Sequence, residues 1–219
     1  MSIVGEVRLY KDLEEERTAW LQRVQATLYH QGVPVIASLT SAAGQARLAT
    51  AELLPAGREA VEVGLRQLDR LTGELDPLRA ELARFSRRQP GCRALRTTHF
   101  GIGPITSVAI WAEMGDTRRF SSSDDAVRHA GLDITVYASD TKRARGHLAK
   151  GRPPCAGSLY EAAVCATRPN SPDHAYFLAV KRRADGHLGV ISVARKLARR
   201  VHHTLRALGD QAWEPVPAV

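Results

Sequence analysis

The sequence lacks the features of secreted and membrane proteins. Among its 219 residues, no apolar run approaches the ~20 residues that a transmembrane helix needs. The first six residues, 1–6, have neither the basic start nor the apolar stretch of a signal peptide. We therefore expect a cytoplasmic protein with no membrane partner.

Cysteine is also scarce. The three cysteines, Cys92, Cys155 and Cys165, form no close pair and no Cys-x-x-Cys unit. An odd number of cysteines argues against a disulfide framework, and the absence of metal-ligand spacing argues against a zinc site. We expect small, reduced side chains at these positions and no metal bound by this chain.

The positive charge is unevenly distributed along the chain. Residues 1–91 contain 12 Lys and Arg against 12 Asp and Glu, whereas residues 92–208 contain 19 against 9. The net charge of +8 therefore comes from one region, as in proteins whose surface neutralises phosphate groups. This distribution favours nucleic-acid binding, although basic proteins with other roles share it.

Two long helical patterns precede this basic region. Residues 6–32 place apolar side chains at three- and four-residue steps. Residues 58–85 have a near-heptad spacing, and Pro77 inside this run predicts a kink or a break. A heptad segment this short needs an antiparallel partner, either the first helix or a second protomer.

A glycine-rich turn introduces the basic region. Gly101-Ile102-Gly103-Pro104 stands before the apolar helix 105–112, the pattern of a helix-hairpin-helix. The two glycines permit a sharp turn, and Pro104 suits the first helical position. The amides of Gly101, Gly103 and Ile105 would then be free to hold a phosphate at a helix N-terminus. The alternative is a tight helical hairpin packed into the core through Ile102.

The remaining residues complete a mainly α-helical prediction. Residues 93–130 indicate two or three short helices, and three further helices are predicted at 157–168, 172–184 and 188–208. The only β-like segment is 134–137. We expect a helical hairpin or coiled coil, followed by a compact helical domain with the helix-hairpin-helix-like element and a small β element.

Two further places carry residues suited to nucleic-acid chemistry. Ser139 lies among basic side chains, and a serine hydroxyl becomes a useful nucleophile only when a base or nearby cations activate it. A basic loop with Ser139 as a turn residue is the alternative. The predicted helices at 172–184 and 188–208 carry basic residues that suit phosphate contacts or a solvated surface. These are Lys181, Arg182, Arg183, Arg195, Lys196 and Arg199.

Several landmarks in a fixed order resemble one protein family. They are Gly101–Pro104, Glu113–Asp116, Arg119–Phe120, Ala130–Leu132, the Ser139–Gly146 loop, Leu159–Ala163 and Val193–Ala198. Across residues 92–208 the chain is similar to the DEDD-type insertion-sequence transposases, which include Piv-like DNA invertases and bridge-RNA-guided recombinases.

The resemblance implies a composite enzyme. In this family an N-terminal RuvC-like domain binds divalent metal, Mg²⁺, through four acidic residues, and a C-terminal domain provides a serine that becomes linked to DNA during strand exchange. Ser139 matches that serine, and Lys142, Arg143 and Arg145 match basic residues of the same loop. The implied partners are DNA, a structured guide RNA in some members, and a second protomer through the coiled coil.

The resemblance also divides the chain and reveals departures. It implies an inter-domain helix in residues 1–34, a linker and coiled-coil segment in 35–91, the C-terminal transposase domain in 92–208 and a tail in 209–219. No part matches the RuvC-like domain, so we expect no cofactor in this chain. Asp140 follows the serine where glycine is usual, and residues 152–157 are shortened.

We therefore expect that this chain alone does not transpose DNA. Four hypotheses stay open. The chain is either a truncated remnant that still binds nucleic acid or a subunit that receives its metal domain from another chain. Alternatively, it is a helix-hairpin-helix protein without strand-transfer chemistry, or a structural coiled-coil dimer.

Overall fold

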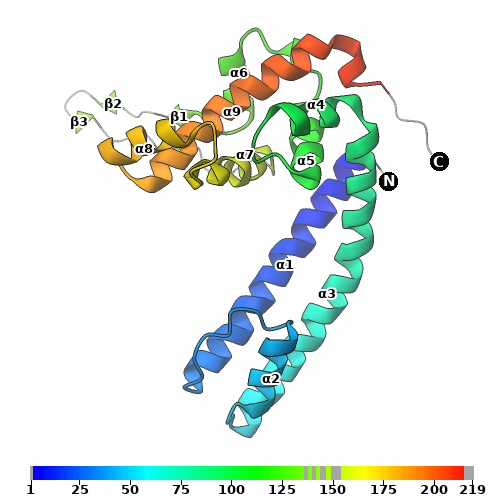
Figure 1. Cartoon of the computed structure of the whole chain (residues 1–219), viewed down its shortest axis with the longest axis vertical. Helices are drawn as coiled ribbons and strands as arrows, with labels where there is room; N and C mark the ends of the chain where they lie inside the picture. The colour runs from blue at the N-terminus through cyan, green and yellow to red at the C-terminus, as the bar shows by residue number, and fades with distance from the viewer. Residues whose placement is uncertain (1, 136–137, 140–141, 144–146, 149–153, 215–219) are drawn as a thin grey trace. The chain divides into compact units, whose positions relative to one another are not determined.

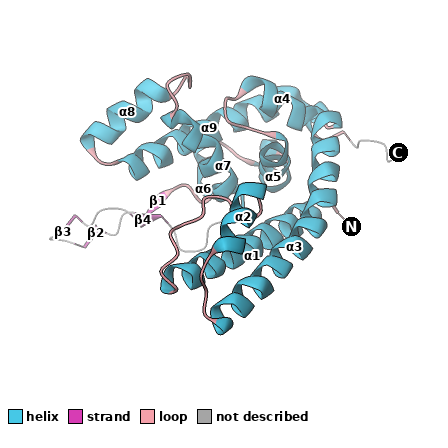
Figure 2. Ribbon diagram, turned by 60° about the horizontal axis from the view of Figure 1, so that its bottom comes forward, coloured by secondary structure: helices cyan, strands magenta, loops and turns pink. Residues whose placement is uncertain are grey.

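The computed structural model describes residues 2–135, 138–139, 142–143, 147–148 and 154–214 (Figure 1). These residues form two compact units. We call residues 8–80 the hairpin unit, and residues 1–7 together with 81–219 the main unit. Most described residues lie in helices, which loops and the short strands β1 to β4 connect (Figure 2). The expected mainly α fold is confirmed.

Two antiparallel helices build the hairpin unit. Helix α1 (Ile3–His30) and helix α3 (Pro55–Arg88) run side by side, with the short helix α2 (Ala42–Thr50) between them in sequence. The contacts run in opposite directions along the two helices: Arg79 bonds Glu14 at 2.8 Å, and Arg70 pairs with Glu16 at 3.8 Å. The first helix is thus the antiparallel partner that the near-heptad segment needs.

Helix α3 continues through Pro77 without a break. A proline inside a helix removes one hydrogen bond to the carbonyl four residues earlier, here that of Gly73. Both Gly73 and Pro77 are exposed, so water can solvate that carbonyl. The predicted break was wrong because the proline falls on the solvent face, where the lost bond costs least.

Helix α9 (Gly186–Leu208) is the centre of the main unit. It packs against α4 (Pro90–Thr98), α6 (Ser123–His129), α7 (Pro154–Val164) and α8 (His174–Arg183). Its predicted apolar stripe is confirmed, since every member is at most 5% exposed: Val190, Val193, Leu197, Val201 and Leu205. A helix that packs against several neighbours needs such a stripe, because the face that it buries has to be apolar.

The other elements of the main unit connect these helices. Helix α5 (Pro104–Met114) packs against α4 and α7, and three 3₁₀ turns are present: η1 (Thr117–Arg119), η2 (Cys165–Thr167) and η3 (Gly209–Ala212). No described helix combines the length and the apolar character that a membrane span requires.

The β element consists of two short antiparallel pairs. Strand β1 (Ile134–Thr135) pairs with β4 (His147–Leu148), and β2 (Ala138–Ser139) pairs with β3 (Lys142–Arg143). Ile134 and Thr135 therefore form a strand as predicted, whereas residues 136–137 lie outside the described residues.

Candidate nucleic-acid interface

The two glycines between α4 and α5 have different roles. Gly101 has a φ of +87°, and a Cβ built on it would lie 2.4 Å from the carbonyl oxygen of Ala162 in α7. Gly103 has a φ of −84°, and a Cβ there would meet no atom within 4 Å. Only Gly101 therefore needs to be glycine for the turn, while Gly103 leaves open space beside the start of α5.

The first amides of α5 lie beside this open space. Gly103 is the N-cap and has no side chain to cap them, and Pro104 occupies the first position without an N–H. The Ser107 amide donates to the Gly103 carbonyl at 2.9 Å, so the amides of Ile105 and Thr106 precede the regular helical bonds. Ile102 is buried at 6% exposure. The geometry thus combines the predicted core anchor with backbone amides that precede the regular helical hydrogen bonds.

Three arginines gather at the same place. A surface pocket of about 500 Å³ is lined by Arg87, Arg93 and Arg96 together with Thr97 and the segment 102–104. Arg87 comes from the end of α3, and Arg93 and Arg96 lie three residues apart on α4. These arginines were not predicted from the sequence, because they flank a predicted boundary and the residues on each side are typical of an ordinary helix end.

The basic end of α8 is exposed and has no carboxylate partner among the described residues. Arg182 and Arg183 donate to the backbone carbonyls of Leu178 and Ala179, at 3.4 and 3.3 Å. Lys181 lies 6.0 Å from the ring of Phe177. All three cations are exposed, so their charge is available to a ligand.

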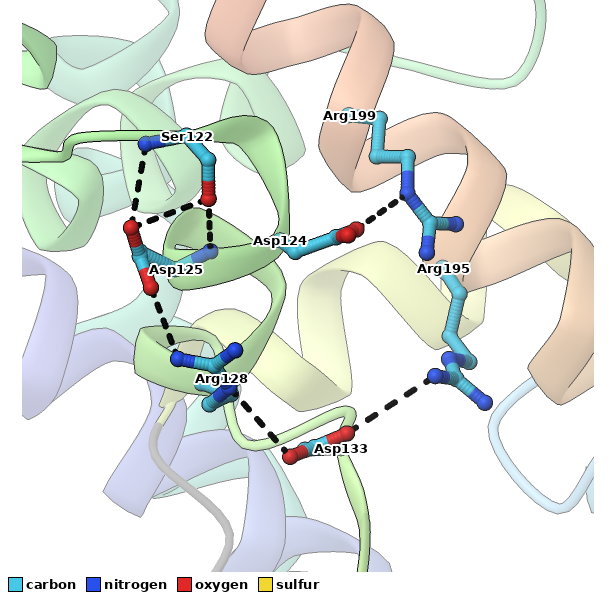
Figure 3. Close-up of polar contacts among 7 residues, drawn as sticks. All are labelled: Ser122, Asp124, Asp125, Arg128, Asp133, Arg195 and Arg199. Atoms are coloured by element: carbon cyan, nitrogen blue, oxygen red, sulfur yellow. Dashed lines mark hydrogen bonds and ion pairs between the residues drawn. The ribbon is translucent and has the colours of Figure 1, made fainter.

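The predicted basic residues of α9 are neutralised instead. The guanidinium of Arg199 donates to Asp124 at 2.8 Å, and Arg195 lies 3.7 Å from Asp133 (Figure 3). Lys196 lies 3.4 Å from the carboxylate of Asp173. The structure therefore separates the predicted cations into a free set on α8 and an ion-paired set on α9.

Figure 3 also shows that these ion pairs extend to Asp133. Arg128 on α6 bonds Asp125 at 2.7 Å and lies 3.6 Å from Asp133, which also faces Arg195. Ser122 caps α6 by accepting a hydrogen bond from the Asp125 amide at 3.2 Å. The Ser122 hydroxyl also donates to the Asp125 carboxylate at 2.9 Å, and this bond lowers the pKa of that carboxyl. Because Asp133 directly precedes β1, the network ties the start of that strand to α9.

The backbone around Ser139 is described in part. Ser139 in β2 stands opposite Lys142 in β3, and Ala138 stands opposite Arg143. The side chains of Ser139, Lys142 and Arg143 lie outside the described residues, as does all of Arg145. Their predicted roles in catalysis and phosphate binding stay predictions.

Cys92 is not a candidate nucleophile. Its side chain is fully buried, and burial raises the pKa of its thiol to about 12. A thiol with that pKa is protonated near neutral pH and unreactive. The interpretation of Cys92 as a small core residue fits this environment.

The acidic residues of the described segments do not form a metal site. No three His, Cys, Asp or Glu side chains in the described part of the chain lie close enough to share an ion. Asp116 and Asp124 face Arg118 and Arg199 instead, at 2.8 Å in each case. The described residues thus do not fit the Mg²⁺ that the resemblance assigns to a RuvC-like domain.

Comparison with known proteins gives one match to a protein family. Residues 92–178, from α4 into α8, match the model of the transposase IS116/IS110/IS902 family. No curated protein matches the chain. The match covers less than half of the chain and supports a similarity of this segment to insertion-sequence transposases.

Proposed function

We propose that this chain is the DNA-binding portion of an insertion-sequence transposase, with Ser139 as the nucleophile of strand exchange. The observation that carries the proposal is the free cationic end of α8, which follows directly after the segment that matches the transposase family. Exposed cations without carboxylate partners bind a phosphate backbone by displacing its condensed counterions. The paired cations of α9 lack this property, because they already face carboxylates.

The proposed chemistry is a transesterification. The Ser139 hydroxyl would form an ester bond to a DNA phosphorus and lose its proton, while the displaced strand leaves with a hydroxyl group that takes up a proton. Cations of the same loop, Lys142, Arg143 and Arg145, would stabilise the charge that develops on the phosphate. The divalent metal of such a site would be held by the acidic residues of a RuvC-like domain.

Neutralising the end of α8 is expected to weaken DNA binding strongly. Each lost phosphate contact removes about 0.9 from the slope of log K against log salt, so the triple variant Lys181→Gln/Arg182→Gln/Arg183→Gln should lose about 2.7 in slope. At 0.1 M salt this corresponds to an affinity about 500-fold lower. The measurement is titration of labelled duplex DNA with the purified chain across a salt series.

A triple variant of the hairpin unit provides the matched control. Arg23→Gln/Arg47→Gln/Arg66→Gln removes the same charge from a region whose basic and acidic residues balance. Equal losses of DNA affinity in the two triple variants would mean that the cations of α8 act through the net charge of the protein alone. Absence of wild-type binding even at low salt would defeat the proposed function and leave a structural role. Tighter binding of structured RNA than of duplex DNA would make RNA the partner.

Ser139→Ala tests the catalytic part of the proposal separately. We expect unchanged DNA affinity, because the alanine removes no charge, and complete loss of the covalent DNA adduct formed with a complementing RuvC-like domain. The adduct is detected as a labelled DNA band that survives denaturation. An adduct that persists in Ser139→Ala would exclude Ser139 as the nucleophile. A chain that binds DNA but never forms an adduct would be a non-catalytic helix-hairpin-helix protein.

A further inference from the structure

We infer that the pocket lined by Arg87, Arg93 and Arg96 holds phosphate groups of a bound DNA strand. The inference rests on the proposed function and adds a second contact site to the one at the end of α8. No carboxylate lines the pocket, and none of the three arginines forms an ion pair with a carboxylate in the described part of the chain. Three unneutralised guanidinium groups around one space repel each other unless an anion lies between them.

The chemistry of the lining fits a phosphate with its sugar. Arginine presents several N–H donors in a planar arrangement that matches phosphate oxygens. Ile102 and Pro104 add an apolar wall, against which a deoxyribose can pack. A volume of about 500 Å³ exceeds that of a single phosphate, so a strand rather than an isolated anion fills it best.

The turn before α5 keeps the pocket accessible to a backbone. Gly103 lines it without a side chain, and a Cβ at this position would meet nothing within 4 Å. The amides of the first turn of α5 and its dipole add partial positive charge at the same end of the helix. Side-chain cations and backbone donors thus act on one ligand.

Two variants test the pocket by independent means. Arg93→Gln/Arg96→Gln removes two cations and should lower the affinity for labelled duplex DNA about 60-fold at 0.1 M salt, with about 1.8 lost from the salt slope. Gly103→Leu fills the pocket without changing any charge and should also weaken binding at least tenfold. Arg47→Gln/Arg66→Gln, which removes two charges from the hairpin unit, is the matched control.

The outcomes separate this inference from the proposed function. Weaker binding by both pocket variants, with an unchanged control and unchanged far-ultraviolet circular dichroism, supports the pocket. If the arginine variant weakens binding but Gly103→Leu does not, the arginines act at a distance and the pocket is empty of DNA. If neither variant differs from the control while the α8 variant still fails to bind, the pocket inference fails and the proposed function stands.

Discussion

Replacing Gly101 with alanine is expected to lower the free energy of unfolding of the main unit by about 4 kcal/mol. Holding a residue with a Cβ at a left-handed φ costs about 1–2 kcal/mol. The new Cβ would also lie 2.4 Å from the Ala162 carbonyl oxygen and 3.0 Å from the Cβ of Cys165. Overpacking of this kind costs about 1–3 kcal/mol, and here a backbone atom has to move.

Gly103→Ala provides the internal comparison, two residues away. Its φ of −84° suits any residue, and no atom lies within 4 Å of the added Cβ. Alanine is a poorer N-cap than glycine, but it also reduces the conformational entropy of the unfolded chain, and these effects oppose each other. We therefore expect a change within about 0.5 kcal/mol.

Urea denaturation of both variants, followed by circular dichroism, measures the difference. Gly101→Ala should shift the midpoint strongly to lower urea, and Gly103→Ala should leave it almost unchanged. Similar midpoints in the two variants would mean that α7 does not approach the turn as closely as described. Because Gly103→Ala stays folded, any loss of DNA binding in it reports on the site rather than on stability.

The helices of the main unit could be predicted from sequence because their signals are local. The stripe on 188–208 repeats every three or four residues, and burial of that face follows from its composition. The glycine–proline turn before α5 has its own local signature in Gly101 and Pro104. The continuity of α3 through Pro77 could not be predicted in this way, since it depends on which face of the helix meets solvent.

The pairing of charges could not be predicted, because it joins residues far apart in sequence. Arg199 and Asp124 are 75 positions apart, and Arg200 and Asp173 are 27 apart. A basic helix face therefore looks identical in sequence whether its cations are free or neutralised. The arginine pocket is a different case, because all its lining residues lie between positions 87 and 104. It could not be predicted because the predicted boundary at 89–91 separates Arg87 from Arg93 and Arg96.

Asp173 shows what this neutralisation does for the fold. Asp173 is only 7% exposed, and its carboxylate accepts two hydrogen bonds from the guanidinium of Arg200, at 2.7 and 2.9 Å. Lys196 lies 3.4 Å from the same carboxylate. One buried acid thus holds two cations of α9 against the start of α8.

Asp173→Asn is expected to destabilise the main unit by about 2 kcal/mol at neutral pH, because hydrogen bonds to a charged group contribute about 1.5–3 kcal/mol. The variant weakens two such bonds from Arg200, whose side chain is 39% exposed, so water compensates part of the loss. Asp185→Asn is the matched control, because Asp185 is exposed and caps α9 through the Leu188 amide, a role that asparagine fills equally well. Chemical denaturation of the two variants gives the difference.

The same substitution should strengthen DNA binding while it weakens the fold. Once Asp173 loses its charge, Lys196 and Arg200 become available to phosphates, and each new contact raises the affinity about eightfold at 0.1 M salt. The measurement is duplex titration under conditions where the variant is still folded. An affinity no higher than that of Asp185→Asn would mean that these two cations face no DNA even when they are free.

The pH dependence of stability gives the sharpest test of the Asp173 pairing. Burial alone would raise the pKa of this carboxyl, but hydrogen bonds and charge from Arg200 and Lys196 outweigh burial and lower it below 3.8. A pKa that is lower in the folded state than in the unfolded state stabilises the fold above pH 3.8, and this stabilisation is lost as the pH falls through the folded pKa. The wild type should therefore lose its advantage over Asp173→Asn as the pH falls below about 4. A stability difference that persists unchanged in acid would show that the asparagine perturbs packing, and that the ion pairs with α9 contribute little to the fold.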